Sequence, residues 1–142
     1  MKQLSLGRDI AAPASIAWSL LTDIGRWPQW GPSIRSARID DESLRLGTLG
    51  TVTTVVGISL PFEVTSFVPD VSWGWKVGGI RATDHIVEAR AEDRCRVTIT
   101  VPFVAAPYLG ICAIALRRIE QLAMDEVRGL ASTTRPNGRP LN

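Results

Sequence analysis

Residues 97–116, VTITVPFVAAPYLGICAIAL, form an uncharged stretch of 20 residues that is followed by two arginines. A helix that spans a bilayer needs about 20 apolar residues, so length alone would allow a membrane span. The period argues against a single helix, because residues 97–103 alternate apolar residues with threonine or proline and helical spacing begins at Ala106. Pro102 and Pro107 flank this change, and proline is common at strand ends and in first helical turns. We therefore predict a strand that runs into a partly buried helix, rather than a membrane span.

Helical spacing continues beyond this stretch. Apolar residues recur every three or four positions as far as Leu130, which predicts a long helix over residues 106–130 that is amphipathic in its second half. Its first half is apolar nearly all round, which indicates contact on more than one side. Residues 132–142 are rich in proline, glycine and arginine, so we expect a disordered tail after a single domain over residues 1–131.

Runs typical of β-strands fill residues 34–103. They are short and separated by turn residues, which predicts a meander of about six strands. The alternation is clearest over residues 71–77, VSWGWKV, where Trp73 and Trp75 share the apolar parity. One face of the sheet is therefore expected to be apolar.

The N-terminal segment adds a strand and two short helical pieces. Residues 3–10 predict a strand, and residues 14–22 predict a short helix opened by a proline. Residues 23–34 contain two glycines and two prolines around Trp27 and Trp30, so a broken helical segment is expected there.

Together these elements predict the α+β class. The expected architecture is a curved antiparallel sheet of about seven strands, with two short helices and one long C-terminal helix packed across its concave face. A helix cannot follow the whole of a strongly curved surface, so we expect a pocket between the sheet and the long helix.

Composition limits the function more than it defines it. With 142 residues, 45% of them hydrophobic and 21% charged, the chain can bury the core of one domain. The 16 basic and 14 acidic residues give a net charge of +2 and form no run of like charge. Nucleic-acid binding is therefore not expected.

Reactive side chains are scarce, which excludes several chemistries. His85 is the only histidine, and Cys95 and Cys112 are the only cysteines, so neither a metal-ligand cluster nor a disulfide framework is predicted. The sequence contains no G-x-S-x-G elbow and no glycine loop of the kind that cradles phosphates, so no cofactor is expected. Residues 1–7, MKQLSLG, lack the apolar core of a signal peptide, so we expect a cytoplasmic protein.

Three segments carry a resemblance to a known family: IAAPASIAWSLLTDIGRWPQWGPSI (10–34), PFEVTSFVPDVSWGWKV (61–77) and ATDHIVEARAEDRCRVTITV (82–101). The chain resembles the START/polyketide-cyclase superfamily (SRPBCC), which has the helix-grip fold, and is similar to its polyketide cyclase/dehydrase-like members. The resemblance implies a hydrophobic cavity, but the superfamily includes lipid-transfer domains, cyclases, receptors and quinone-binding proteins. Fold alone therefore does not select a function.

The apolar parity of the predicted strands defines the expected wall of the pocket. Phe62, Val64 and Ser66 on one strand, Trp73 and Trp75 on the next, and residues 81–89 and 97–103 beyond them are expected to contribute inward side chains. Trp27, Trp30 and Tyr108 are expected at the mouth. The candidate ligand-binding residues are Trp27, Trp30, Phe62, Val64, Trp73, Trp75, Arg81, His85, Val87, Val101, Phe103, Tyr108 and Cys112. The alternative is that Trp73 and Trp75 simply fill the core.

His85 is open to three interpretations: an acid or base, a group that orients the ligand, or a structural residue. An imidazole titrates near neutral pH, but acid–base work also needs a partner within hydrogen-bonding reach. Asp84 projects to the opposite face of the strand, which leaves Arg81 and Tyr108 as candidate partners.

Three functions follow from these observations. The first is binding or transport of a small hydrophobic ligand, such as a lipid, a quinone or an aromatic polyketide. The second is a polyketide cyclase or dehydratase that uses His85 with Arg81 or Tyr108 and needs neither metal nor nucleotide. The third is an interaction module in which residues 108–116 dock on a partner or a membrane.

Overall fold

A strand and a helix share residues 97–116, as the change of period predicts. The structure, a computed structural model, describes residues 3–133, except for the side chains of Phe103, Val104, Ala106 and residues 131–133. The strands are β1 (Gln3–Ile10), β2 (Ile34–Ile39), β3 (Leu49–Thr54), β4 (Ser59–Val68), β5 (Ser72–Val77), β6 (Ile80–Ala91) and β7 (Arg94–Pro102). The helical elements are α1 (Ala14–Thr22), η1 (Ile24–Arg26), α2 (Trp27–Trp30), η2 (Phe103–Tyr108) and α3 (Leu109–Thr133), where η marks a 3₁₀ segment.

The long helix is shifted from its predicted position. It begins at Leu109 instead of Ala106, because the segment around Pro107 forms the separate 3₁₀ element η2. It continues through Thr133, whereas the tail was expected to start at Ser132, and residues 134–142 lie outside the described part. No helix within residues 3–133 is long and apolar enough to cross a membrane.

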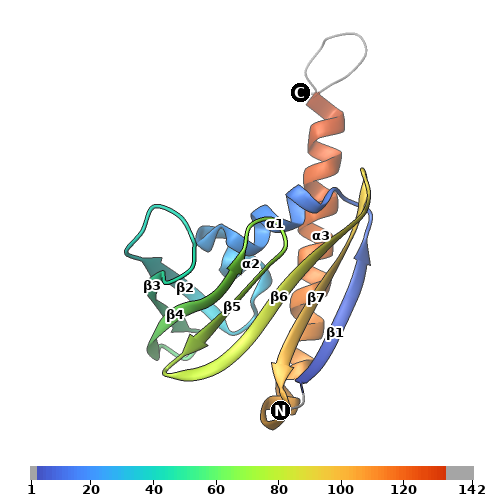
Figure 1. Ribbon diagram of the computed structural model, residues 1–142. Coiled ribbons are helices and arrows are strands. Elements are labelled where there is room, and N and C mark those ends of the chain that lie inside the picture. The colour runs from blue at the N-terminus through green and yellow to red at the C-terminus, as the bar shows by residue number, and fades with distance from the viewer. Residues whose placement is uncertain (1–2, 134–142) are drawn as a thin grey trace.

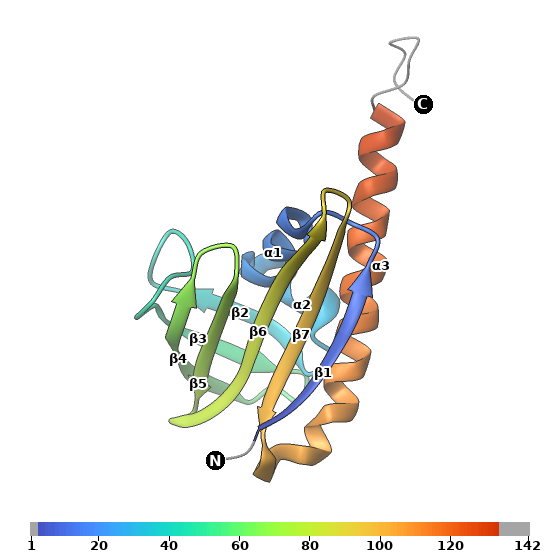
Figure 2. The ribbon, with the colours of Figure 1, turned by 45° about the vertical axis from the view of Figure 1, so that its right-hand side comes forward.

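The seven strands form one antiparallel sheet in the order β1-β7-β6-β5-β4-β3-β2. The sheet curves, with α3 across its concave side along β1 and β7, and α1 and α2 over the same side farther along (Figure 1, Figure 2). Two ion pairs of 2.8 Å attach α3 at its flanks, one from Arg8 of β1 to Glu120 and one from Arg26 of η1 to Glu126. Both pairs are partly exposed, and such pairs contribute under about 1 kcal/mol each. Apolar burial therefore holds the helix on the sheet.

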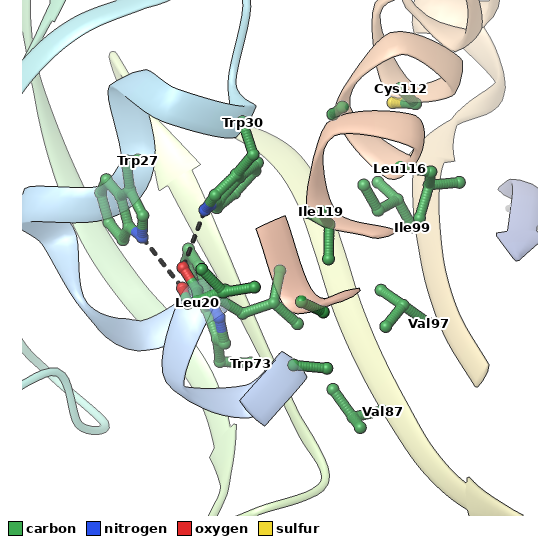
Figure 3. Packing of buried hydrophobic residues seen from close by; sticks show 14 of the residues in the cluster. Leu20, Trp27, Trp30, Trp73, Val87, Val97, Ile99, Cys112, Leu116 and Ile119 are labelled. Carbon is green, nitrogen blue, oxygen red and sulfur yellow. Dashed lines mark hydrogen bonds between the residues drawn. The ribbon is translucent and has the colours of Figure 1, made fainter. Parts of the chain in front are cut away.

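The first half of α3 is buried on one side. Cys112, Ala115 and Leu116 are buried, and Figure 3 shows Leu116 close to Ile99 of β7. Tyr108 and Gly110 remain exposed and the residues between the buried positions are half-buried, so the third hypothesis stays a prediction for this surface. The apolar character of this half is explained by contacts with β7 and α2.

A bulge in β4 changes which side chains of this strand face the core. The pairing of β4 with β5 shifts between Val64 and Ser66, so the alternation slips by one residue. Ser66, which was expected inside, is exposed, and Phe67 takes the inward position against the indole of Trp18 at a ring distance of 5.6 Å.

The turn from α1 to α2 is held by two indole groups. The Trp27 N–H donates to the carbonyl of Leu21 at 2.9 Å, and the Trp30 N–H donates to the carbonyl of Leu20 at 2.7 Å (Figure 3). These carbonyls lie in the last turn of α1, where a helix leaves its C=O groups without intrahelical partners. Because each indole satisfies a carbonyl with its own N–H, both rings can be buried.

Burial of Trp27 creates an aromatic cluster, defined here as Trp27, Phe62, Trp73 and Trp75. Trp27 stacks on Trp73 with ring centres 5.4 Å apart and planes at 8°, and it meets the edge of Trp75 at 5.3 Å. Phe62 packs against Trp75 at 5.2 Å. Trp27 and Trp30 therefore lie in the core, and the prediction that they stand at the mouth of a pocket is wrong.

Replacing Trp27 by phenylalanine should lower the free energy of unfolding by about 1–3 kcal/mol beyond the loss of ring area, because the Leu21 carbonyl would be buried without a donor. Urea unfolding followed by far-ultraviolet circular dichroism measures the change without depending on tryptophan fluorescence.

Trp18→Phe is the matched control, since the Trp18 indole is only partly buried and its N–H makes no hydrogen bond within the described residues. Equal losses in the two variants would contradict the role given to the Trp27 N–H.

Candidate functional site

A pocket of about 390 Å³ lies between the sheet and the junction of η2 with α3. Most of its wall is apolar: Ile34, Val52, Leu60, Trp75, Val77 and Val101. The polar lining residues are Ser33, Thr54, Arg81, Thr83 and Tyr108. The wall therefore comes from β2 to β7 and is closed by Tyr108 ahead of α3.

A smaller void of about 30 Å³ adjoins this pocket toward α3. It shares Trp75, Thr83 and Tyr108 with the pocket, and its own lining includes His85 and Cys112. A void of this size has room for a water molecule but not for an organic ligand. Thr83 and Trp75 therefore separate the space for a ligand from the surroundings of His85.

The structure divides the predicted site residues into three groups. The pocket is lined by Trp75, Arg81, Val101 and Tyr108, and the small void additionally by Trp30, His85 and Cys112. Buried in the core, on the wall of neither space, are Trp27, Phe62, Val64, Trp73 and Val87. The side chain of Phe103 lies outside the described part. The core-filling alternative thus holds for Trp73, whereas Trp75 is both buried and part of the pocket wall.

Sequence reasoning missed the contribution of β2 and β3 to the pocket, and in β4 it named Phe62, Val64 and Ser66 but not Leu60. Val52 and Thr54 share one parity in β3, and Leu60 lies in β4, so the alternation of these strands was the available signal. Thr83 was expected to point inward but was not named as a site residue. Ser33 had no recognisable signal, because it lies in the irregular segment before β2.

A chain of hydrogen bonds connects the pocket wall to His85. The Trp75 N–H donates to Thr83 Oγ1 at 3.0 Å, Thr83 Oγ1 lies 2.9 Å from His85 Nε2, and His85 Nδ1 lies 3.2 Å from the carbonyl of Trp73. A carbonyl only accepts, so Nδ1 carries the proton and, in the neutral ring, Nε2 accepts from the Thr83 hydroxyl. This assigns the tautomer and satisfies both nitrogens of His85.

Burial also sets the charge of His85. The ring stacks on Trp73 at a centre distance of 4.1 Å and 25°, and desolvation lowers the pKa of His85 from 6.5 to about 4, although the Trp73 carbonyl and Asp84 act in the opposite direction. The imidazole is therefore neutral at physiological pH. Its hydrogen bonds hold the Thr83 hydroxyl in place.

Arg81 does not partner His85. Its guanidinium pairs with Asp84 at 3.1 Å, and Asp84 also accepts from the Thr100 hydroxyl at 3.3 Å. Asp84 has the opposite strand parity to His85, as predicted, and the Arg81 guanidinium reaches it although Arg81 also lines the pocket. Arg81 lines the pocket, as its strand parity predicts, but it pairs with Asp84 and makes no hydrogen bond to His85.

Tyr108 closes one side of the pocket. Its hydroxyl shares a hydrogen bond of 2.9 Å with the Ser33 hydroxyl, which connects the start of α3 to the segment before β2. Burial raises the pKa of Tyr108, although the bond to Ser33 opposes this effect. The phenol therefore stays protonated at neutral pH and makes no hydrogen bond to His85 within the described residues.

The two thiols are also uncharged. Cys95 and Cys112 are free and buried, and burial raises the pKa of Cys112 to about 11. The pKa of Cys95 is raised for the same reason. Neither thiol has the lowered pKa of a nucleophilic cysteine.

Because the chain has a single histidine, its imidazole can be followed by nitrogen-15 NMR without assignment. We expect a neutral ring protonated on Nδ1 at pH 7 and a pKa of about 4. A ring protonated on Nε2, or a pKa near 6.5, would contradict the hydrogen-bond chain.

The same shift makes stability depend on pH. The unfolded chain binds the proton near pH 6.5 and the folded chain only near pH 4, so the contribution of His85 is complete above about pH 6.5 and is lost as the pH falls toward 4. The loss should be about 3 kcal/mol. His85→Gln, in which no group titrates at this position, should lose correspondingly less in urea unfolding over the same pH range; an equal loss would refute the assignment.

Comparisons with known proteins agree with this fold. Protein NE0264 from Nitrosomonas europaea has 18% identity and a TM-score of 0.65, over 89% of this chain and 96% of that chain. Norcoclaurine synthase from Thalictrum flavum, in complex with dopamine and hydroxybenzaldehyde, has 15% identity and a TM-score of 0.63, over 87% of each chain. The di-domain ARO/CYC protein BexL of the BE-7585A biosynthetic pathway has 12% identity and a TM-score of 0.67, over 96% of this chain and 48% of that chain. At these identities the likeness establishes the fold alone.

A search of curated proteins finds no match to the sequence. A family model described as polyketide cyclase/dehydrase and lipid transport matches residues 1–131. The match covers nearly the whole chain and agrees with the helix-grip architecture of the sheet and α3. The chain therefore belongs to the polyketide cyclase/dehydrase and lipid transport family.

Proposed function

We propose that the protein binds a small, uncharged, largely apolar molecule in the pocket next to Trp75. The observation that carries this proposal is the pocket itself, a space of about 390 Å³ walled mainly by aliphatic side chains and one indole. Ligand pockets commonly measure about 300–1,000 Å³ and combine an apolar wall with a few polar groups. Ser33, Thr83 and Tyr108 supply hydroxyl groups in this wall.

The electrostatics favour an uncharged ligand. Arg81 is the only charged residue among the described lining residues, and Asp84 already pairs with it. A charged ligand group would lose hydration in the pocket without gaining a free counter-ion, which is costly in an apolar environment. Hydroxyl, phenol and carbonyl groups fit this wall better than carboxylates or phosphates.

The volume favours a compact ligand over a long lipid chain. The aromatic cluster occupies the concave face beneath α1 and α2, so the pocket lies near the lower end of the usual size range. The norcoclaurine synthase structure contains two compounds with one aromatic ring each, dopamine and hydroxybenzaldehyde. A ligand of one or two rings is the class that we propose here, within the broader set of lipid, quinone or polyketide.

We do not assign acid–base catalysis to His85 in this proposal. Both of its nitrogens are engaged, with Thr83 and with the carbonyl of Trp73, and neither Arg81 nor Tyr108 bonds to it. A cyclase that uses His85 as its acid or base would first have to break this arrangement. We therefore propose ligand binding or transport, and not catalysis by His85, as the function of this pocket.

Narrowing the pocket should remove binding. N-phenyl-1-naphthylamine, an uncharged two-ring-system fluorophore, should bind the wild-type protein with a saturable rise in emission. Val77→Phe places a larger side chain in the wall and should weaken this binding at least about tenfold, the equivalent of about 1.4 kcal/mol.

Val71→Phe is the control, because Val71 is exposed in the turn between β4 and β5 and does not line the pocket. The proposal would be contradicted if N-phenyl-1-naphthylamine bound without saturation, or if Val77→Phe left its binding unchanged.

A further inference from the structure

Exposed apolar side chains gather on two turns beside the pocket. Val56 in the turn between β3 and β4 is 75% exposed, and Ile80 after the turn between β5 and β6 is 71% exposed. Val55 and Ile58 are also largely exposed. Turns of this kind usually carry glycine, proline or polar residues, so exposed valine and isoleucine need an explanation. We name residues 55–58 and 78–80 the mouth turns.

The mouth turns border the pocket opening. Thr54, directly before the first turn, and Ile80, in the second, both line the pocket. The Val55 N–H donates to the carbonyl of Ser33 at 3.1 Å, and Ser33 lines the pocket too. Figures 1 and 2 show the β5–β6 turn at the same lower end of the molecule as the start of α3.

Backbone hydrogen bonds close both turns. In the first, the Thr54 N–H donates to the carbonyl of Ile58 at 2.8 Å and the Gly57 N–H donates to Thr54 at 2.9 Å. In the second, the Gly78 N–H donates to the carbonyl of Pro61 at 2.8 Å. Gly57 has φ of +87°, a conformation that glycine adopts without strain. The turns are therefore ordered structures that present Val56 and Ile80 outward.

A cation without a carboxylate partner lies on the first mouth turn. The guanidinium of Arg35 donates to the carbonyl of Val55 at 3.0 Å, and its other terminal nitrogen lies near Gly57. Within residues 3–133, no aspartate or glutamate forms an ion pair with Arg35. The apolar tip therefore carries an unneutralised positive charge.

On the neighbouring strands the charges balance. Lys76 of β5 lies opposite Glu63 of β4, and Arg81 of β6 is paired with Asp84. The excess positive charge near the mouth is thus located at Arg35, beside Val55 and Val56.

We propose that the mouth turns dock on the surface of a bilayer that contains anionic lipid. Val56 and Ile80 insert among the headgroups, and Arg35 meets the lipid phosphates. Apolar side chains next to cationic ones favour the headgroup layer, and each arginine near an anionic membrane adds attraction. Val56 and Ile80 are mostly exposed and lie on separate turns, so a deformable layer can surround both, whereas a protein partner would need matching hollows. The docking needs no ligand, so it stands apart from the proposed pocket function.

Co-sedimentation with vesicles of phosphatidylcholine and phosphatidylglycerol tests this surface. Wild-type protein should bind these vesicles, and Val56→Glu and Ile80→Glu should each weaken binding about tenfold, since each removes an apolar side chain from the bilayer and adds repulsion. Leu46→Glu is the matched control: Leu46 is 63% exposed in the β2–β3 loop, at the opposite end of β3 (Figure 1).

The charge is tested separately. Arg35→Gln should lower binding to the anionic vesicles about fivefold, whereas Arg38→Gln, at another exposed arginine of β2, should leave it unchanged. Three results would overturn the proposal: no binding of the wild-type protein to anionic vesicles, an equal loss for Leu46→Glu, or a wild-type dimer in solution that Val56→Glu separates into monomers.

Discussion

Two hydrogen bonds at the end of α1 determine how the concave face of the sheet is filled. The indole N–H groups of Trp27 and Trp30 satisfy the carbonyls of Leu21 and Leu20, which the helix leaves unpaired. Without these bonds, burial of either the carbonyls or the indoles would leave a polar group without a partner, at a cost of about 1–3 kcal/mol each. With them, Trp27 enters the core and stacks on Trp73. The aromatic cluster then fills the concave face beneath α1 and α2 and leaves the pocket at the end of the sheet near Tyr108.

Hydrogen bonds between buried polar groups also determine the protonation state of His85. Thr83 and His85 lie beside the aromatic cluster. The Trp75 N–H donates to Thr83, Thr83 bonds to His85, and His85 bonds to the carbonyl of Trp73. A buried imidazole satisfied in this way is more stable neutral than charged, so its pKa falls to about 4. The sole histidine of the chain therefore positions the Thr83 hydroxyl in a pocket wall without free charge. This wall supports the proposed binding of an uncharged molecule.

The spacing of apolar residues along the chain was sufficient to predict many of the strands and helices. The change of period at residues 97–106 correctly separates β7 from α3, and the predicted strand 3–10 and helix 14–22 coincide with β1 and α1. Three features depend on the partners that strands and side chains find in the folded structure, which alternation along the chain does not encode. The exposure of Ser66 depends on the shift in the β4–β5 register, and the pairing of Arg81 with Asp84 instead of His85 depends on side-chain geometry. The placement of Trp27 depends on a carbonyl six residues earlier, on a different helix. Of the 13 residues predicted to bind a ligand, five fill the core instead: Trp27, Phe62, Val64, Trp73 and Val87.

The five tryptophans allow this division between core and pocket to be measured in one experiment. Their indole N–H signals can be recorded by nitrogen-15 NMR during titration with N-phenyl-1-naphthylamine. The Trp75 signal should shift most, because Trp75 lines the pocket, whereas the Trp18 and Trp27 signals should stay nearly unchanged. If the Trp27 signal shifted most while Trp75 stayed constant, the ligand space would lie beneath α2, and the arrangement of core and pocket described above would be wrong.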